Sequence, residues 1–364
     1  MKEGWKMVKL REVCEIINGK NQKEVISPEG QFPILGSGGN VMGYATEYLC
    51  PAGTIIIGRK GSINNPLFID TPFWNVDTAF GFNARDNYER KLLYYFCLLF
   101  DFEKLNKGTT LPSLVKSDLL QIEIPLPPLE EQHRIVSILD TSFEKIDALK
   151  KNAEEILKNA KALFQQVLAQ ELKPKEGWVE KRLDEIATFY NGKAHEQCID
   201  ENGKYILVNS KYISSNTMVG KRTNSQLFPL YKDDIVMVMS DVPNGKALAK
   251  CLIIPTDDTH SLNQRICVFR NSKINVKLLY YLINRNPYLL SFNNGENQTN
   301  LRKNDILKMR LSYPTNEAEV EFVLNRLDEQ INLINELIKN KEQTIRECDA
   351  LKQSILRQAF SGEL

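Results

Sequence analysis

The sequence predicts an α+β protein in which two tandem β-rich domains alternate with two long helices. Three observations carry this prediction. Apolar residues recur in alternating steps of four and three from Ile135 to Val167, and again from Val323 to Ile355. Segment 3–20 aligns without gaps on segment 176–193, with eight of eighteen residues identical. Between the helical stretches, short apolar runs are separated by Gly, Pro, Asn and Asp, which is typical of strands and turns. The chain is therefore an internal repeat with pseudo-two-fold character.

The first long helix is expected to begin just after Pro127 and Pro128, since proline cannot continue a helix backwards. Glu130 and Glu131 place negative charge on its first turn, where the helix dipole favours it. A length of about 40 residues corresponds to roughly 60 Å at 1.5 Å per residue. Each helix carries one apolar seam with a 3.5-residue period, so we expect the two helices to pair as a coiled coil. The seams are Ile135, Leu139, Ser142, Ile146, Leu149, Ala153, Ile156, Ala160, Leu163 and Val167, and Val323, Leu327, Gln330, Ile334, Leu337, Lys341, Thr344, Cys348, Leu351 and Ile355.

A second apolar row runs beside each seam. It is formed by Val136, Phe143, Leu157 and Phe164 in the first helix, and by Leu324, Ile331, Ile338 and Ile345 in the second. An apolar face this broad can pack on more than one neighbour. We therefore expect Val136, Phe143, Leu157, Phe164, Ile331, Ile338 and Ile345 to bind a partner protein, while packing on the globular domains is the alternative.

The repeat predicts four segments: a domain over 1–128, a long helix over 129–172, a second domain over 173–315 and a second helix over 316–364. KLLYY occurs at 91–95 and 277–281, and 105–127 matches 292–314 at a turn. Strands are expected in the runs 32–39, 53–58, 66–70 and 78–84 of the first copy, and in 204–210, 234–240, 247–255 and 265–270 of the second. Helices are expected at about 8–17, 89–104 and 116–120.

Composition is that of an ordinary soluble protein, with 42% hydrophobic and 26% charged residues in 364. The longest apolar run and the amino-terminal residues lack the pattern of a membrane span or a signal peptide, which indicates a cytoplasmic protein. Seven cysteines without a CxxC pair, and three histidines, give no metal-ligand spacing, so no metal is expected. The net charge of +1 is unevenly distributed, because residues 172–315 hold 21 Lys and Arg against 14 Asp and Glu. Such an excess suits a polyanion partner, although a solvated surface would show the same.

Two loops in each copy are candidates for binding nucleic acid. Arg59 and Lys60 lie between glycines, where backbone can approach a phosphate, and Ser62, Asn64 and Asn65 follow as short side chains able to reach base edges. The alternative is a polar surface hairpin. The loop's counterpart in the second copy, at 239–250, holds Ser240, Asn244 and Lys246, and a later strand adds Gln264 and Arg265. The second candidate loop holds Lys107, Thr109, Thr110 and Lys116 in one copy, and Asn297, Gln298, Arg302 and Lys303 in the other.

No catalytic constellation is found. LGSGGN at 35–40 fails the dinucleotide pattern, and Asn65-Pro66-Leu67-Phe68 lacks the second proline of amino-methyltransferases. A P-loop, a clustered nuclease set and a nucleophile elbow are also missing from the sequence.

Four features of the sequence belong together: LPPLEEQHRIVSILD at 126–140, the EGW openings, GRKGSI followed by NVDTAF, and the closing LKQSILRQAFSGEL. Together they resemble the specificity subunit of type I restriction-modification systems. The second copy departs from the pattern, because SYPTNEAEVEFVLNRLD lacks the Pro-Pro and Glu-Gln pairs. The resemblance implies two target-recognition domains that each read half of a split, asymmetric DNA target, held apart by an antiparallel coiled coil. It also implies a non-catalytic chain in complex with two methyltransferase subunits, which carry S-adenosylmethionine, and with restriction subunits. A self-contained methyltransferase or nuclease and a structural coiled-coil protein remain the alternatives.

Overall fold

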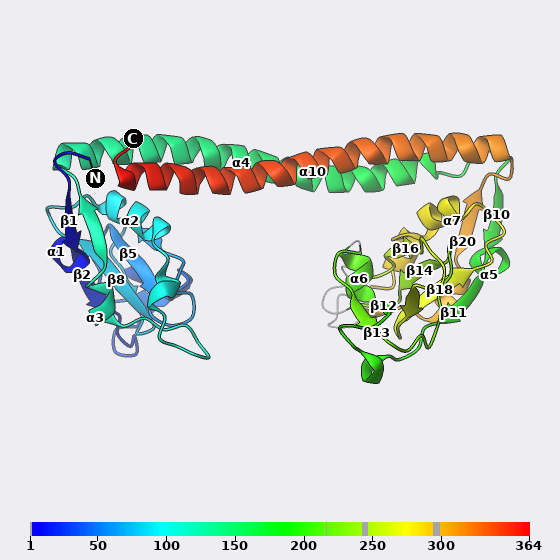
Figure 1. Cartoon of the computed structure of the whole chain (residues 1–364), viewed down its shortest axis with the longest axis horizontal. Helices are drawn as coiled ribbons and strands as arrows, with labels where there is room; N and C mark the ends of the chain where they lie inside the picture. Colours follow the sequence, from blue (N-terminus) through cyan, green and yellow to red (C-terminus); the bar gives the residue numbers. More distant parts are fainter. Residues whose placement is uncertain (1, 216, 242–246, 294–298) are drawn as a thin grey trace. The chain divides into compact units, whose positions relative to one another are not determined.

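The computed structural model describes residues 2–215, 217–241, 247–293 and 299–364. The chain divides into two compact units. Unit 1 contains Met1–Leu157 with Asn340–Leu364, and unit 2 contains Lys158–Lys339. Each unit therefore combines one globular part with a portion of both long helices (Figure 1).

Unit 1 is built on a four-stranded sheet in the order β2-β8-β5-β6, a three-stranded sheet β4-β3-β7 and the pair β1-β9. Its elements are β1 (Lys6–Lys9), α1 (Leu10–Val13), β2 (Cys14–Asn18), β3 (Phe32–Leu35), β4 (Val41–Ala45), β5 (Thr54–Gly58), β6 (Leu67–Ile69), β7 (Trp74–Asn75), β8 (Ala79–Ala84), α2 (Arg90–Leu99), the 3₁₀ helix η1 (Phe102–Leu105), α3 (Lys116–Leu119) and β9 (Glu123–Leu126). The fully buried β5 sits between β8 and β6, as expected for a central strand made of Thr, Ile and Gly. The strands expected in the first copy are thus confirmed.

Unit 2 repeats this topology. Its sheets run in the orders β11-β18-β14-β16, β13-β12-β17, β10-β20 and β15-β19. The elements are β10 (Val179–Arg182), α5 (Leu183–Ile186), β11 (Thr188–Asn191), η2 (Glu196–Cys198), β12 (Tyr205–Val208), α6 (Ser210–Ser214), β13 (Lys221–Thr223), β14 (Ile235–Val238), β15 (Ser240–Asp241), β16 (Cys251–Ile253), β17 (His260–Leu262), β18 (Ile266–Arg270), α7 (Val276–Ile283), α8 (Pro287–Leu290), β19 (Thr299–Asn300), α9 (Lys303–Leu307) and β20 (Arg310–Tyr313). The register Lys6↔Leu126 of β1-β9 recurs as Val179↔Tyr313 in β10-β20.

The helix predicted over 8–17 is confirmed only for Leu10–Val13, because residues 8 and 9 belong to β1 and residues 14–17 to β2. Only α1 is helical, and the chain continues as β2, which pairs antiparallel with β8. Cys14 and Ile16 are buried while Glu15 between them is exposed, so the period of two decides the structure. Sheet pairing outweighs the helix-like spacing of the apolar residues here.

The two long helices are α4 (Leu129–Glu171) and α10 (Glu317–Ser361), and they run antiparallel within each unit. In unit 1, Lys150 pairs with Asp349 at 2.6 Å and Asp147 pairs with Lys352. In unit 2, Arg326 of α10 pairs with Glu171 at 2.9 Å. Within the described residues, neither these helices nor the shorter ones are apolar enough over sufficient length to cross a membrane.

The seam is less regular than the heptad pattern predicts. Ile135, Leu139 and Leu327 are buried, but Leu149, Leu163 and Leu351 remain 53%, 44% and 49% exposed. The exposed residues belong to one of the two rows that make up each seam. The other row of the first helix stays buried along its whole length, at Leu139, Ile146, Ala153, Ala160 and Val167.

The second apolar row is used inside the chain. Val136 and Phe143 are 8% and 9% exposed and belong to the core of unit 1, and Ile331, at 7%, belongs to the core of unit 2. Phe143 meets the ring of Tyr95 edge to face, with centroids 5.2 Å apart. These three residues therefore do not offer a docking surface, and packing on the globular domains, the alternative, is what the structure shows. Leu157, Phe164, Ile338 and Ile345 are half-buried.

Each globular part is fixed to the long helix behind it by the same three polar side chains. In unit 1, Asp140 of α4 accepts from the Tyr95 hydroxyl at 2.5 Å and pairs with Lys91 Nζ at 2.6 Å. In unit 2, Asp328 of α10 accepts from the Tyr281 hydroxyl at 3.0 Å and pairs with Lys277. Burial, followed by the hydrogen bond to the aspartate, raises the pKa of both tyrosines.

All seven cysteines are free thiols, and six of them are buried. Burial raises the pKa of Cys14 and of Cys50 to about 12. These thiols are packing residues with little thiolate character. The described residues contain no group of three or more His, Cys, Asp or Glu placed to hold a metal ion.

Candidate nucleic acid interface

The two candidate loops of unit 1 form one surface. The loop that follows β5 and the segment that precedes α3 are joined by backbone hydrogen bonds from Gly61 N to Pro112 O and from Leu114 N to Arg59 O, both 2.9 Å. An isolated bridge also pairs Lys60 with Ser113. The sequence predicted both loops but not that they adjoin, because about 50 residues separate them along the chain.

The tip formed by residues 106–113 is closed on itself. Asn106 Oδ1 accepts from Gly108 N at 2.8 Å and from Ser113 N at 2.9 Å, and Lys107 N donates to Ser113 O at 2.9 Å. These three bonds return the chain to its starting point, so the tip is a preorganised loop.

Most candidate residues of unit 1 point into solvent. Exposed are Arg59, Lys60, Ser62, Asn64, Asn65, Lys107, Thr109 and Thr110. The Arg59 guanidinium lies 5.8 Å from the centre of the Phe80 ring, and Lys107 pairs with Asp118 at 3.3 Å, so both cations are oriented without being covered.

Two candidate residues of unit 1 serve the loop framework. Asn64 Oδ1 accepts from Phe102 N at 2.9 Å, which ties the loop to η1. Lys116 is half-buried, and its Nζ donates to Ile16 O at 2.6 Å. Asn64 Oδ1 and Lys116 Nζ are thus engaged by backbone groups of the loop framework, while Asn64 remains exposed.

Unit 2 builds the same frame from different residues. Leu301, the match of Leu114, donates from N to Met239 O at 2.7 Å, and Met239 N donates to Arg265 O at 3.0 Å. Strand β15 pairs with β19, Ser240 opposite Asn300. Ser240 is only 7% exposed, so the expectation that its hydroxyl reaches DNA is wrong for this structure.

Gln264, Arg265, Arg302 and Lys303 are exposed on unit 2. Arg265 has a positive φ of 68°, a left-handed backbone conformation that is uncommon for a residue other than glycine. Lys303 Nζ lies 5.4 Å from the centre of the Phe189 ring. Asn244, Lys246, Asn297 and Gln298 lie outside the described residues.

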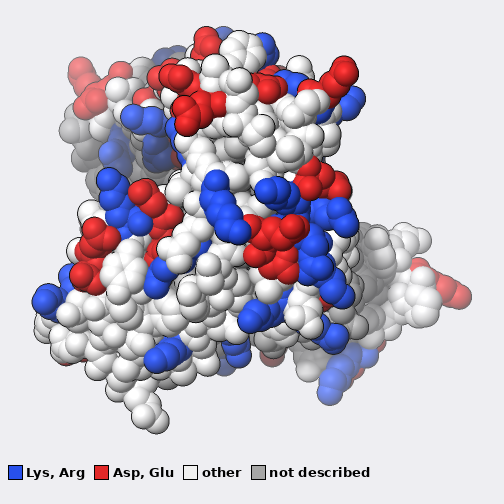
Figure 2. Space-filling view, turned by 90° about the vertical axis from the view of Figure 1, so that its right-hand side faces the viewer, with Lys and Arg blue, Asp and Glu red and all other residues white. Residues whose placement is uncertain are grey.

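Charge on the molecule is mixed in sign. On the face shown in Figure 2, Lys and Arg side chains are interspersed with Asp and Glu. The surplus of basic residues in 172–315 is thus not spread as a uniform field on that face, and binding of a polyanion would depend on local loop cations.

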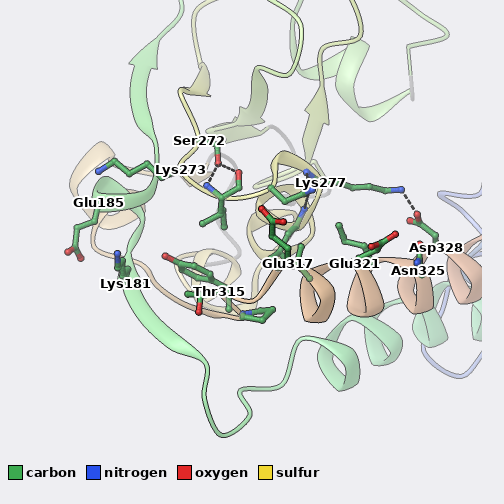
Figure 3. Close-up of a pocket in the computed structure, with 17 residues that line it drawn as sticks. Lys181, Glu185, Ser272, Lys273, Lys277, Thr315, Glu317, Glu321, Asn325 and Asp328 are labelled. Carbon is green, nitrogen blue, oxygen red and sulfur yellow. Dashed lines mark hydrogen bonds and ion pairs between the residues drawn. The ribbon is translucent and has the colours of Figure 1, made fainter.

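Unit 2 also contains a cavity of about 840 Å³ between the first turns of α10 and the loop that precedes α7 (Figure 3). Ile274 and Val320 line it, and Lys277 reaches Asp328 along one side. Lys181, Glu185, Glu317 and Glu321 also contribute to its lining, so its walls combine apolar and charged groups.

The two copies differ in residues that line this cavity. At the matching positions of unit 1 stand Tyr88 and Gln132, which are 3% and 0% exposed. The Tyr88 hydroxyl donates to Pro125 O at 3.2 Å. Gln132 Nε2 donates to Pro127 O at 2.8 Å, and its Oε1 accepts from Glu89 N at 2.7 Å. Ile274 and Val320 lack these polar groups, so this part of the cavity lining in unit 2 has no counterpart of the hydrogen bonds made by Tyr88 and Gln132.

Sequence reasoning missed three functional features. Asn106 was not singled out, although an Asn two residues before a glycine is a recognisable turn signal. Leu111 was overlooked because it is apolar in a polar loop. The KLLYY sequence shows only a repeat, whereas in the structure its Lys and its second Tyr, four residues apart, bind one aspartate at matched positions of the long helices.

Two copies of one α+β domain, each with a loop joined by hydrogen bonds to the segment before its last short helix and each fixed to the long helices, define a modular recognition protein. The family profile described as type I restriction modification DNA specificity domain matches residues 2–158 and 175–347. The chain belongs to this family.

Known relatives share this organisation over nearly the whole chain. The specificity subunit of the type I restriction enzyme MjaVIII from Methanocaldococcus jannaschii is 22% identical over 412 residues, covering 100% of this chain and 93% of that protein. The EcoDI specificity subunit of Escherichia coli is 21% identical, covering 99% and 88%.

Solved structures show the same fold. A chain from a structural study of complex assembly and conformational transition of the type I R-M system superposes with a TM-score of 0.79 at 19% identity, covering 100% of this chain and 99% of that one. The HsdS subunit of Thermoanaerobacter tengcongensis gives a TM-score of 0.52 at 18% identity, covering 100% and 98%.

Proposed function

We propose that this chain is the DNA-reading, non-catalytic subunit of a type I restriction-modification complex, and that each unit reads one half of a bipartite, asymmetric target. The observation that carries this proposal is the joined loop surface of each unit. In both, the loop after the central strand is hydrogen-bonded to the segment before the last short helix, and exposed cations and amides lie on it. Phosphate contacts position such a protein, and side chains on base edges specify the sequence.

The partners follow from family membership and from the repeat. Double-stranded DNA is the ligand, and two methyltransferase subunits and the restriction subunits assemble with the chain. In this proposal, S-adenosylmethionine is bound by the methyltransferase partner. The two pseudo-symmetric units offer two similar environments to two copies of one partner.

Lys60 and Arg265 test the assignment, one in each unit. The chain is co-expressed with its methyltransferase partner, and methylated adenines are mapped for the native complex and for K60A and R265A. If a side chain contacts a base, its loss relaxes one position in one half-site at a cost of about 1–3 kcal/mol. If the side chain contacts a phosphate, the affinity for all DNA sequences falls alike and the salt dependence of binding becomes less steep.

Lys145, exposed on α4 away from the loops, supplies the matched control, and K145A should leave target and affinity unchanged. Exchanging residues 1–125 with those of a relative should alter one half-site only. Methylation by the purified chain without its partner would instead support the self-contained enzyme, and equal binding of target and unrelated duplexes would support a purely structural role.

A further inference from the structure

An apolar side chain stands at the centre of the tip of unit 1. Leu111 is 54% exposed, and its neighbours Lys107, Thr109 and Thr110 are exposed polar residues. A single exposed leucine is ordinary on a protein surface. Leu111 differs because it belongs to the loop that the Asn106 hydrogen bonds close, so the fixed backbone of this loop keeps the leucine side chain exposed.

Two glycines shape the surroundings of Leu111. A Cβ added at Gly108 would stand 1.8 Å from Leu111 O, so only glycine permits this close return of the chain. Leu111 Cδ1 lies 3.9 Å from the Cβ position of Gly61, which places the leucine against the loop that carries Lys60 and Ser62. The leucine is thus part of the joined surface and is held from both sides.

We propose that Leu111 recognises the C5-methyl group of a thymine in the half-site read by unit 1. Thymine alone among the four bases presents a methyl group in the major groove, and apolar side chains are the groups that contact it. The flanking lysines and threonine hydroxyls match the phosphates and polar base edges on either side of such a methyl group. This inference rests on the proposed function and adds a specificity-determining residue to it.

The test removes one methyl group from the DNA. Once methylation mapping has defined the target, duplexes are made in which each thymine of the half-site assigned to unit 1 is replaced singly by deoxyuridine. Equilibrium binding of the complex with its methyltransferase partner is then measured by competition. Burial of one methyl group corresponds to about 0.8 kcal/mol, so one replacement should weaken binding about fourfold.

In L111A the same replacement should have no effect, because the partner of the methyl group is gone. Val41, on strand β4 and 56% exposed, provides the matched loss of exposed apolar surface, and V41A should keep the fourfold effect.

Two outcomes would overturn the inference while leaving the proposed function intact. One is a native complex that discriminates its target but is indifferent to every deoxyuridine. The other is an L111A complex that retains the full loss. A complex that does not distinguish its target from an unrelated duplex would instead contradict the proposed function itself.

Discussion

Replacing Gly108 by alanine should abolish reading by unit 1 without unfolding it. The added Cβ would stand 1.8 Å from Leu111 O, whereas real Cβ contacts essentially never fall under 3.0 Å. The backbone of the tip must therefore move by about 1 Å or more, which is enough to misplace side chains on base edges, since functional groups need positioning to about 0.5 Å.

The stability cost follows from the bonds that close the tip. Movement endangers the two hydrogen bonds to Asn106 Oδ1, and each hydrogen bond contributes about 1 kcal/mol. A loss of about 1–2 kcal/mol lowers the melting temperature by a few degrees in a domain of this size. The fold persists because the tip lies outside the core of unit 1.

The assay compares binding of the target with binding of duplexes altered in one half-site, and thermal unfolding is recorded in parallel. Gly38 provides the control, because a Cβ there meets only Asn40 Oδ1 at 3.9 Å, so G38A should behave like the native chain. If G108A discriminates the half-site of unit 1 as well as the native complex does, the tip is not the reading surface.

Three further outcomes follow from the contrast between the two copies and from one ion-paired carboxylate. Q132V gives unit 1 the residue that unit 2 has at the matching position and leaves Glu89 N and Pro127 O without this hydrogen-bond partner. The free energy of unfolding, measured by chemical denaturation, should fall by about 1–3 kcal/mol. An unchanged free energy of unfolding would show that the Gln132 amide is dispensable. The reverse pair I274Y with V320Q should occupy part of the cavity of unit 2, restore the matching hydrogen bonds and raise its melting temperature. A lower melting temperature would mean that the larger side chains do not fit. The hydrogen bond from Arg134, then that from Lys2, lowers the pKa of Glu131 from 4.5 to about 2. Because the folded-state pKa is lowered, the stabilisation is present above about pH 4.5 and is lost as the pH falls toward 2, so R134A should flatten acid unfolding in that range.

The sequence by itself determined the order of domains and helices. The internal repeat indicated which segments of the two copies correspond, and the apolar runs bounded by turn residues located strands β5, β8, β14 and β18. These features are local, so a pattern within a short window reveals them. Even the loops that carry Arg59 and Lys107 were identified in this way.

Only the tertiary structure decided how those pieces meet. Sheet pairing made residues 14–18 a strand, and packing buried Phe143 and Ile331 in the cores of their units. The joining of two loops in each unit, the closure of the tip by Asn106 and the exposure of Leu111 depend on contacts between residues far apart in the chain or on loop conformation. A single sequence does not display such contacts, because residue type and periodicity report the local environment of a side chain and not the identity of its distant neighbours.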